Sequence, residues 1–465
     1  MKPGLPVEVV VVTDTRDPVG ARPTLWFDLT DLAVWSGPLT GIQRVIAGLA
    51  AEFLADRGGV GGAAGAQADA DGHPRLRFCY YKRHEGFFAL PDEATRALLA
   101  RVGGGGAPLV RAKGHRVLGP LRRRLKGEQA PFAPGDALFY AGIVTNQAKL
   151  RHLEATVERL VMPVIVVIHD VIPLKFREWC KVRTFESFER WFAFVARRAA
   201  LILTPSAHTC SDVAQLAGAA GIACRRLATV PLPHTLPRRP DTVAEEDGGK
   251  EAKADIIGPG PWPVSSDAAA ALPDRFALPG RFALYVSTIE PRKNHRLLFY
   301  LWKRLLDRHP PAAVPDLVLL GKRGWQSNDF LSELSNAGYL GGKITWIAEA
   351  DDALLALAYR RCAFTVFPSF YEGFGLPVAE SLGFGKPCLA SDQASIPEVG
   401  GDLVDYFDPY ELSQAYALVE TAIFHEAFLA SRSQRIRERF RPTDWPAYAR
   451  RMRGEIESAF CVQGT

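Results

Sequence analysis

The sequence has no long apolar run. Its longest apolar stretches, such as residues 161–168 and 317–320, are much shorter than the ~18 residues that a membrane-spanning helix needs. Near the N-terminus, Glu8 and Asp14 bracket a few valines, so the apolar core of a secretory signal is missing there. These absences argue against a membrane-spanning or signal-directed chain and predict a cytoplasmic protein.

Cysteine pairs and a strong charge bias are also missing. The seven cysteines have no Cys-x-x-Cys spacing, and their odd number argues against a disulfide framework, so we expect reduced packing residues. A net charge of +5 over 465 residues is mild and does not indicate a nucleic-acid partner. No Gly-x-Gly-x-x-Gly motif follows an early strand, which argues against a nicotinamide-dependent enzyme.

Short apolar runs alternate with amphipathic stretches along the chain. Residues 297–306 carry the apolar stripe of a helix packed on a sheet, and residues 184–198 show a similar pattern. Such alternation predicts parallel sheets with crossover helices, and the length is sufficient for two α/β domains. The predicted strands are 25–29, 76–81, 138–140, 164–168 and 200–203 in the first half, and 282–287, 317–320, 344–347, 363–367 and 387–390 in the second.

Composition suggests the domain boundaries. Residues 237–278 are rich in Pro, Gly, Ala and charge, with few large apolar side chains, which predicts a linker or exposed excursion. It separates an N-terminal domain, 1–236, from a C-terminal domain, 279–440, and a terminal helix is expected within 441–465. The Gly, Ala and Asp-rich tract 58–72 predicts a loop inside the first domain.

A basic amphipathic stretch lies at residues 111–126. Its seven Lys and Arg side chains are interleaved with valine and leucine and accompanied by almost no acids. Such a stretch can lie on an anionic membrane surface. A solvated basic segment is the alternative, and the pattern leaves both open.

Two carboxylates stand eight positions apart in the segment PSFYEGFGLPVAE, residues 368–380. The apolar run 363–369 predicts a buried strand, the following glycines permit a sharp turn, and helical spacing starts near Phe374. Glu372 therefore lies on a loop and Glu380 inside the next helix. Acceptors so placed can hold hydroxyls at both ends of a nucleotide sugar; a solvated loop residue and a surface helix residue are the alternatives.

The same loop is a candidate anion site. The first N–H groups of a helix lack intrahelical partners and lie at the positive end of its dipole. Here they belong to Phe374, Gly375 and Leu376, and the glycine allows close approach. We therefore expect these three residues to contact a phosphate of the ligand.

This segment resembles the Glu-x7-Glu motif of retaining glycosyltransferases, most closely family four, the glycosyl transferases group 1. The resemblance implies the GT-B fold, an α/β architecture of two Rossmann-like domains facing a central cleft. It implies that Glu372 is a catalytic residue touching the donor sugar and that Glu380 binds the ribose. It also implies that the terminal helix returns to the first domain.

A second candidate anion site is STIEPRKNH, residues 287–295, where a strand passes into a helix. Arg292 and Lys293 can neutralise a departing diphosphate there; a solvated helix start is the alternative. The family has a Lys-Asn pair at this place, so the resemblance implies that Lys293, also catalytic, and Asn294 bind the donor. The family arginine corresponds to Thr288, kept as a donor-binding position, and Arg292 is expected to supply its charge.

In the first half, His169 and Asp170 follow the buried strand 164–168. The family carries a histidine at this strand end near the reacting centre, which implies a catalytic role for His169; a structural histidine is the alternative. Asp170 either orients the imidazole or caps the next turn. Gly41 corresponds to the family's first Gly-rich loop and is expected near the diphosphate, with Arg44 as a secondary source of charge.

The nucleobase is placed by resemblance near Ile347 and Ala348, and Asp352 is expected to cap the helix that follows. GDP-mannose is the first expected co-substrate, with UDP-sugars and dTDP-rhamnose open. No permanent cofactor is expected. The resemblance implies that no bound metal is needed, which fits the absence of an Asp-x-Asp cluster beside the donor motifs.

The resemblance thus implies a retaining, metal-independent hexosyltransferase acting on an oligosaccharide or lipid-linked glycan. The implied pathway is bacterial surface polysaccharide or lipopolysaccharide synthesis, on the inner face of the plasma membrane if residues 111–126 bind lipid. A catalytically inactive glycan-binding or scaffold protein of the same fold and a sugar-nucleotide 2-epimerase are the alternatives.

Overall fold

A computed structural model gives the structure of the protein. It describes residues 23–35, 39, 41–58, 74–83, 85–103, 129, 131–143, 146–235 and 278–461. The basic stretch 111–126, nearly all of the predicted linker 237–278 and nearly all of the tract 58–72 lie outside the described residues.

The first sheet has seven strands in the order β3-β2-β1-β4-β5-β6-β7. All neighbours are parallel except β2 and β3, which form an antiparallel pair at one edge. The strands are β1 (Thr24–Asp28), β2 (Arg75–Lys82), β3 (Gly86–Leu90), β4 (Ala137–Tyr140), β5 (Val164–Val167), β6 (Ala199–Thr204) and β7 (Leu227–Thr229).

Helices cover both faces of the first sheet. Side chains along a strand alternate between the two faces, so an apolar strand contributes to a core on each face. In β1, Leu25 and Phe27 join the core under α2 and α4, whereas Trp26 joins the core under α6 and α8. The helices of this domain are α1 (Thr30–Val34), α2 (Gly41–Gly58), α4 (Asp92–Gly103), α6 (Gln147–Leu160), α7 (Ile172–Lys175), η1 (Arg177–Trp179), α8 (Val182–Arg198) and α9 (Ala207–Ala219).

The second sheet has six parallel strands in the order β10-β9-β8-β11-β12-β13. Alternate side chains of β8 again enter two cores, Tyr285 with α11 (His295–Arg308) and α17 (Leu412–Phe424), and Leu284 with α14 (Asp352–Arg361). The strands are β8 (Phe282–Val286), β9 (Asp316–Leu320), β10 (Ile344–Ile347), β11 (Phe364–Phe367), β12 (Cys388–Ser391) and β13 (Asp405–Phe407).

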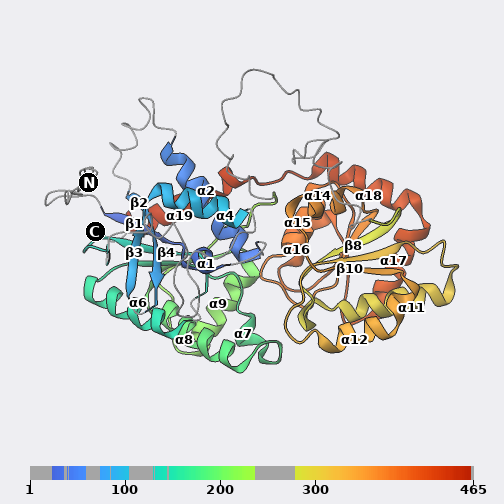
Figure 1. Ribbon diagram of the computed structural model, residues 1–465, viewed down its shortest axis with the longest axis horizontal. Coiled ribbons are helices and arrows are strands. Elements are labelled where there is room, and N and C mark those ends of the chain that lie inside the picture. The colour runs from blue at the N-terminus through green and yellow to red at the C-terminus, as the bar shows by residue number, and fades with distance from the viewer. Residues whose placement is uncertain are drawn as a thin grey trace, which may run out of the picture.

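The helices of the second half lie on both faces of this sheet, and the two lobes stand side by side (Figure 1). They are η3 (Pro291–Lys293), α11 (His295–Arg308), α12 (Asn328–Asn336), α13 (Gly338–Gly341), α14 (Asp352–Arg361), α15 (Leu376–Gly383), α16 (Ile396–Gly400), η4 (Gly401–Leu403), α17 (Leu412–Phe424) and α18 (Glu426–Arg439).

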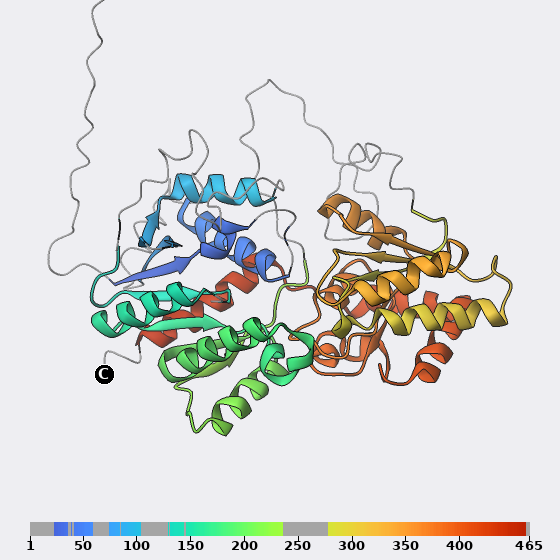
Figure 2. The same cartoon turned by 60° about the horizontal axis from the view of Figure 1, so that its bottom comes forward.

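The last helix, α19 (Trp445–Cys461), lies against the first domain and not the second. Figures 1 and 2 both show it, in red, within the lobe built from the blue and green segments. Trp445, Tyr448, Met452 and Ile456 bury themselves in the first domain's core. The helix passes so close to Gly48 of α2 that a Cβ there would overlap the ring of Trp445.

The two Rossmann-like domains confirm the predicted fold class, and the predicted strands are present with each end shifted by at most one residue. The pattern missed β3, β7 and β13, which are short or lie at sheet edges. Among the described residues, none of the helices combines the length and the apolarity needed to cross a bilayer.

Candidate functional site

A cleft of about 520 Å³ lies between the two domains. Its walls are the loops that follow the carboxyl ends of strands, where open parallel sheets bind ligands. The first domain contributes the residues after β5, β6 and β7 and the start of α2; the second contributes those after β8, β9, β10 and β11 and the start of α15. This volume suits a ligand of nucleotide size.

Glu372 lies in the loop after β11 and is held by two cations. Its Oε1 lies 2.6 Å from Nζ of Lys293, and its Oε2 lies 2.7 Å from Nη1 of Arg292. Burial raises the pKa of Glu372, but the charges of Arg292 and Lys293 outweigh burial and bring that pKa to about 2. The side chain is therefore a carboxylate at any working pH.

Arg292 and Lys293 end the short helix η3, directly before α11. Arg292 also contacts Glu290 at 2.7 Å and donates to the carbonyl oxygen of Tyr371 at 2.6 Å. Burial lowers the pKa of Lys293 and Arg292 adds to that effect, while Glu372 opposes it. Arg292 is held charged, because its acidic neighbours raise its pKa in spite of burial.

Glu380 lies in the first turns of α15, facing the cleft. Its Oε2 accepts a hydrogen bond of 2.8 Å from the hydroxyl of Tyr359 on α14. Its Oε1 lies 3.3 Å from Nη1 of Arg44, which comes from α2 of the first domain. The other guanidinium nitrogen of Arg44 lies 2.8 Å from Asp352. Burial raises the pKa of Glu380, and Arg44 opposes that rise.

The start of α15 meets the expectation of a Gly-rich helix terminus. Gly375 precedes the helix with φ at 111°, a left-handed conformation that favours glycine, and Pro377 lies in the first turn. No side chain caps this helix start. The terminus therefore faces the cleft with the positive end of its dipole toward any ligand.

His169 follows β5 and lines the first-domain wall of the cleft. Its Nε2 lies 2.7 Å from the carbonyl oxygen of Ala141. Burial lowers the pKa of His169 to about 4, although the bond to that carbonyl favours the protonated form. A neutral ring that donates from Nε2 is the state at neutral pH. Asp170 caps the next turn by accepting from the amide of Ile172 at 3.0 Å.

The cleft brings together most of the side chains that the sequence indicated. Thirteen of those positions line it: Gly41, Arg44, His169, Asp170, Thr288, Arg292, Lys293, Ala348, Glu372, Phe374, Gly375, Leu376 and Glu380.

Asn294 and Ile347 are not among the lining residues. Asn294 has a left-handed backbone with φ at 55°, and its side-chain amide donates to the carbonyl oxygen of Pro409 at 2.9 Å. Ile347 points into the core beside α14, and the next residue, Ala348, lines the cleft in its place. Side chains alternate along a strand, so a shift of one residue changes the face.

The predicted helix cap at Asp352 is wrong. Asp351 has the extended backbone of an N-cap, and its side chain accepts from the amide of Leu354 at 2.8 Å. Asp352 is the first residue of α14 and pairs with Arg44 instead.

Several polar residues near the cleft were not predicted from the sequence. Tyr359 sits in an apolar helical pattern that predicts only packing, yet it holds Glu380. Asp212 of α9 contacts Tyr371 of the second domain, a pairing that depends on how the domains meet. Ser206 is the N-cap of α9, for which a serine at a helix start is a readable signal.

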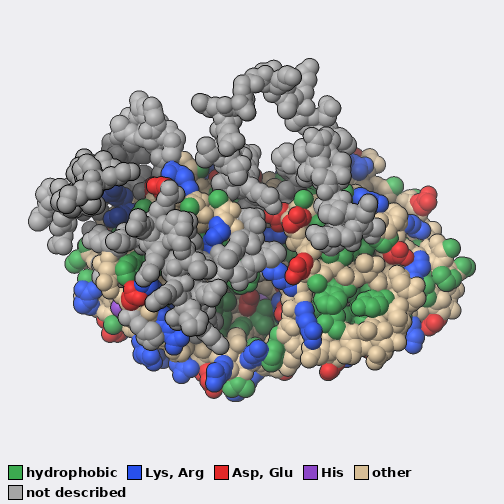
Figure 3. All heavy atoms as spheres, in the orientation of Figure 1, with side chains coloured by type: hydrophobic (Ala, Val, Ile, Leu, Met, Phe, Trp, Pro, Cys, Tyr) green, Lys and Arg blue, Asp and Glu red, His purple; other side chains and the backbone are tan. Residues whose placement is uncertain are grey.

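The charge of the described surface is mixed. On the face drawn in Figure 3, basic and acidic side chains alternate over the second domain around an apolar area. Among the described residues, no three His, Cys, Asp or Glu side chains converge as they would at a metal centre.

A comparison with models of known protein families gives a match that covers most of the second domain. Residues 274–429 match the family model described as glycosyl transferases group 1. This range contains the Lys293 segment, the Glu372 loop and Glu380.

Two mannosyltransferases of Escherichia coli are similar in sequence. O-antigen chain mannosyltransferase B is 40% identical over 131 residues, 28% of this chain and 34% of that protein. A serotype-specific mannosyltransferase WbdA is 28% identical over 271 residues, 58% of this chain and 31% of that protein. The chain thus spans about a third of the length of these curated relatives.

Solved structures with the same architecture cover nearly the whole chain. Anabaena Alr3699/HepE in complex with UDP and glucose has a TM-score of 0.54 at 14% identity, covering 94% of this chain and 100% of that one. Sucrose-phosphate synthase from Thermosynechococcus elongatus has a TM-score of 0.56 at 14% identity, covering 95% of this chain and 100% of that one. The chain therefore has the GT-B fold, and its second domain is similar to the glycosyl transferases group 1.

Proposed function

We propose that the protein is a retaining mannosyltransferase that moves the sugar of a nucleoside diphosphate donor to a hydroxyl of a glycan acceptor. One observation carries the proposal. In the interdomain cleft, the Glu372 carboxylate is held by Lys293 and Arg292 at one end, and Glu380 faces the same cleft at the other. Second-domain residues would hold the donor, and the first domain would hold the acceptor.

The diphosphate fits beside Lys293, Arg292 and the start of α15. Arg292 offers a planar fork and Lys293 a point charge, and both are preorganised in a buried place. The sugar would then lie against Glu372, and the ribose hydroxyls would reach Glu380. The base would lie toward Ala348, beyond the end of β10.

The proposed reaction replaces one bond to the anomeric carbon by another on the same face. The acceptor oxygen bonds to C1 while the bond from C1 to the diphosphate oxygen breaks. The acceptor proton passes to the departing phosphate oxygen, and a nucleoside diphosphate leaves. Lys293 and Arg292 stabilise the charge that develops on that leaving group, the task a metal would otherwise perform. The neutral ring of His169 lines the opposite wall, facing the sugar.

The substrate assignment rests on the relatives. Both E. coli proteins are named as mannosyltransferases, one of them for the O-antigen chain. We therefore place GDP-mannose first among donors and a surface polysaccharide or lipopolysaccharide glycan first among acceptors. HepE was crystallised with UDP and glucose, so UDP-sugars belong in the same screen, with dTDP-rhamnose.

A thermal-shift screen of GDP, UDP, ADP and dTDP identifies the base. A ligand present at 100 times its dissociation constant adds about 2.7 kcal/mol to the free energy of unfolding, so the correct nucleotide stands out. Transfer is then followed with the matching sugar donor, and the anomeric configuration of the product is read by NMR. An axial donor and an axial product support retention, and an inverted product contradicts it.

Chelation and residue replacement complete the test. Turnover that persists in excess EDTA supports metal independence, whereas its loss and recovery with a divalent ion contradicts it. Glu372→Gln is expected to lower transfer by at least about a hundredfold, the size of effect seen when one transition-state contact is removed. Binding without any turnover of donor indicates an inactive glycan-binding protein, and conversion of the donor sugar without transfer indicates an epimerase.

Membrane contact is a separate proposal, resting on the basic residues 111–126. Co-sedimentation with vesicles of anionic phospholipid is expected, falling with salt and with the triple change of Arg122, Arg123 and Arg124 to Glu. Equal binding to neutral vesicles contradicts the electrostatic explanation.

A further inference from the structure

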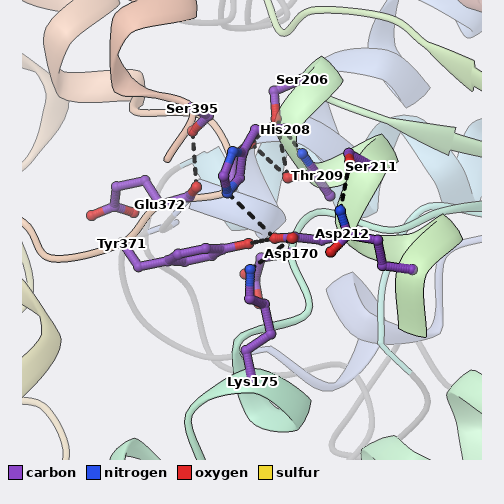
Figure 4. Close-up of polar contacts among 12 residues, drawn as sticks. Asp170, Lys175, Ser206, His208, Thr209, Ser211, Asp212, Tyr371, Glu372 and Ser395 are labelled. Atoms are coloured by element: carbon purple, nitrogen blue, oxygen red, sulfur yellow. Dashed lines mark hydrogen bonds and ion pairs between the residues drawn. The ribbon is translucent and has the colours of Figure 1, made fainter. Parts of the chain in front are cut away.

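Tyr371, the residue before Glu372, binds the Glu372 loop to the first domain. The ring of Tyr371 points toward α9, and its hydroxyl donates to Asp212 of that helix (Figure 4). Asp212 also forms an ion pair of 2.6 Å with Lys175 of α7, and its carboxylate lies 3.4 Å from Nε2 of His208. Asp212 and Tyr371 are 5% and 4% exposed, so the contact is buried between the domains.

The residue after the acid is fastened as well. The carbonyl oxygen of Gly373 accepts from Ser206 Oγ at 2.7 Å and from Thr209 Oγ1 at 3.0 Å, both at the start of α9. Gly373 lies so close to the backbone of His169 that a Cβ would overlap its carbonyl oxygen. Glycine is required here by close approach of the two domains.

The second domain contributes its own ties around the same loop. The hydroxyl of Ser395 lies 2.8 Å and 2.9 Å from the carbonyl oxygens of Glu372 and Phe374. Glu398 accepts from the amides of Ala207 and His208 at 2.7 Å each, and so caps α9 from the other domain. The carboxylate of Glu398 meets the positive end of the α9 dipole.

We propose that Asp212 and Tyr371 are positioning residues, which set Glu372 toward the donor sugar when the two domains meet. The role of Glu372 in this inference rests on the proposed function. Tyr371 and Gly373 flank Glu372 and both form hydrogen bonds to the first domain, at the start of α9 and at Asp212. The loop of Glu372 therefore has all of these contacts only when the two domains lie against each other. The first domain therefore holds in place an acidic side chain of the donor-sugar site that belongs to the second domain.

Charge and protonation fit this arrangement. Burial and the neighbouring Asp212 carboxylate raise the pKa of the Tyr371 phenol, so it stays a donor. Lys175 balances the Asp212 charge, and the ring of Phe176 packs on Tyr371 with centroids 5.0 Å apart. Removal of the phenolic oxygen alone would break the tie and leave the ring packing in place.

The contacts to the nucleoside and the position of Glu372 depend on different residues. The nucleoside contacts at Glu380 and beyond do not pass through Tyr371 or Asp212, and these contacts lie within the second domain or reach Arg44. Loss of the tie should therefore lower kcat and spare binding of the free nucleotide. A merely structural role would instead lower stability and binding together.

The test uses Tyr371→Phe and Asp212→Asn in the full chain, with Tyr300→Phe as matched control. Tyr300 also donates to a carboxylate, Glu333, but on the outer surface of the second domain. In ligand-free protein, amide exchange in peptides covering 369–376 is expected to be about tenfold faster in Tyr371→Phe and Asp212→Asn, and unchanged in Tyr300→Phe. Unchanged exchange in both cleft variants overturns the proposal.

Turnover gives a second, independent measure. We expect kcat to fall about tenfold to a hundredfold in Tyr371→Phe, the loss of one bond to a charged group, with nucleoside diphosphate affinity within twofold of the wild type. In the Glu372→Gln background, the same change should have no further effect, because its action passes through Glu372. Full additivity of the two changes overturns the proposal.

The two hypotheses fail in different ways. If the unaltered protein turns over none of the donors, the proposed function is wrong, and the exchange data alone then decide whether α9 holds the loop. If the protein is active and Tyr371→Phe retains wild-type kcat, the positioning role is wrong and the proposed function stands.

Discussion

Arg44 and Glu380 face each other across the interdomain cleft, with Nη1 and Oε1 3.3 Å apart. Arg44 is held more closely by Asp352, at 2.8 Å, so a ribose hydroxyl can compete for Glu380 while the guanidinium stays beside the ligand. The pair thus joins the two domains at the place where the resemblance puts the sugar ring of the nucleoside.

Removing this cation should weaken nucleotide binding. We expect Arg44→Ala to raise the dissociation constant for the preferred nucleoside diphosphate by about tenfold, because a partly buried positive charge near a polyanion is lost. Isothermal titration measures it. Arg198→Ala, which removes an exposed pair with Glu158 on the outer surface, is the matched control and should leave affinity unchanged. Equal affinity in Arg44→Ala contradicts the assignment.

Replacing Glu372 should expose the charge balance of the cleft. In Glu372→Gln, Arg292 and Lys293 stay beside each other, largely buried, and lose the carboxylate they share, although Arg292 keeps Glu290; this is expected to cost about 3 kcal/mol of unfolding free energy. Inorganic pyrophosphate should restore part of the lost stability. The thermal shift caused by pyrophosphate should therefore be larger in Glu372→Gln than in the wild type. Glu333→Gln, at a surface pair, should change stability by less than about 0.5 kcal/mol. A smaller shift in Glu372→Gln than in wild type would refute this charge argument.

Acid should destabilise the protein through two buried imidazoles. Burial lowers the pKa of His169 to about 4 and that of His295 to about 3, where Lys293 adds to the effect. Below about pH 6.5 these two histidines bind protons in the unfolded chain but not in the folded protein. The free energy of unfolding therefore falls by about 1.4 kcal/mol for each histidine with every unit by which the pH is lowered. That fall continues until the pH reaches the folded pKa. The stability that the lowered pKa of Glu372 contributes is lost only below about pH 4.5.

Replacement of His295 checks this slope. Its ring lies among aromatic rings, 4.8 Å from Tyr285 and 5.6 Å from Phe330, so His295→Phe should fit without a titrating group. Urea unfolding between about pH 5 and about pH 6.5 should show the slope reduced by about 1.4 kcal/mol per pH unit. An unaltered slope means that His295 is not the source.

Two glycine replacements in neighbouring helices should have opposite signs. Alanine for glycine inside a helix ordinarily stabilises by roughly 0.5–1 kcal/mol. At Gly454 of α19 a Cβ meets nothing within 4 Å, so Gly454→Ala should show that gain in urea unfolding. At Gly48 it would overlap Trp445, so Gly48→Ala should destabilise by about 1–3 kcal/mol. A stabilising Gly48→Ala would mean that α19 packs less closely on α2.

Apolar periodicity predicted much of the fold because most strands are buried on both faces. The prediction of 344–347 coincides with β10, and 363–367 differs from β11 by one residue. It failed for β13, which has three residues of which only Phe407 is fully buried, and for β3, an antiparallel edge strand with no crossover helix. Short edge elements carry little periodic signal.

The sequence predicted which side chains lie together where they follow strands of the same parallel sheet. Glu372 and Lys293 come from loops after parallel strands, and the carboxyl ends of such strands meet at one edge, so their ion pair follows from the motifs. Asp212 was not predicted, because its partner Tyr371 belongs to the other domain and the contact needs their relative placement. Asp352 was mistaken for a cap because two adjacent aspartates stand at the start of α14, and only backbone angles distinguish the cap from the first helical residue.

The chain passes from the first domain to the second between β7 and β8 and comes back between α18 and α19, so the halves are covalently linked twice. A single cut anywhere between residues 235 and 278 would leave a C-terminal piece that still includes α19. That helix supplies Trp445, Tyr448 and Met452 to the other piece's interior. The severed protein should therefore stay assembled as two complementary fragments, and separately expressed halves should find each other.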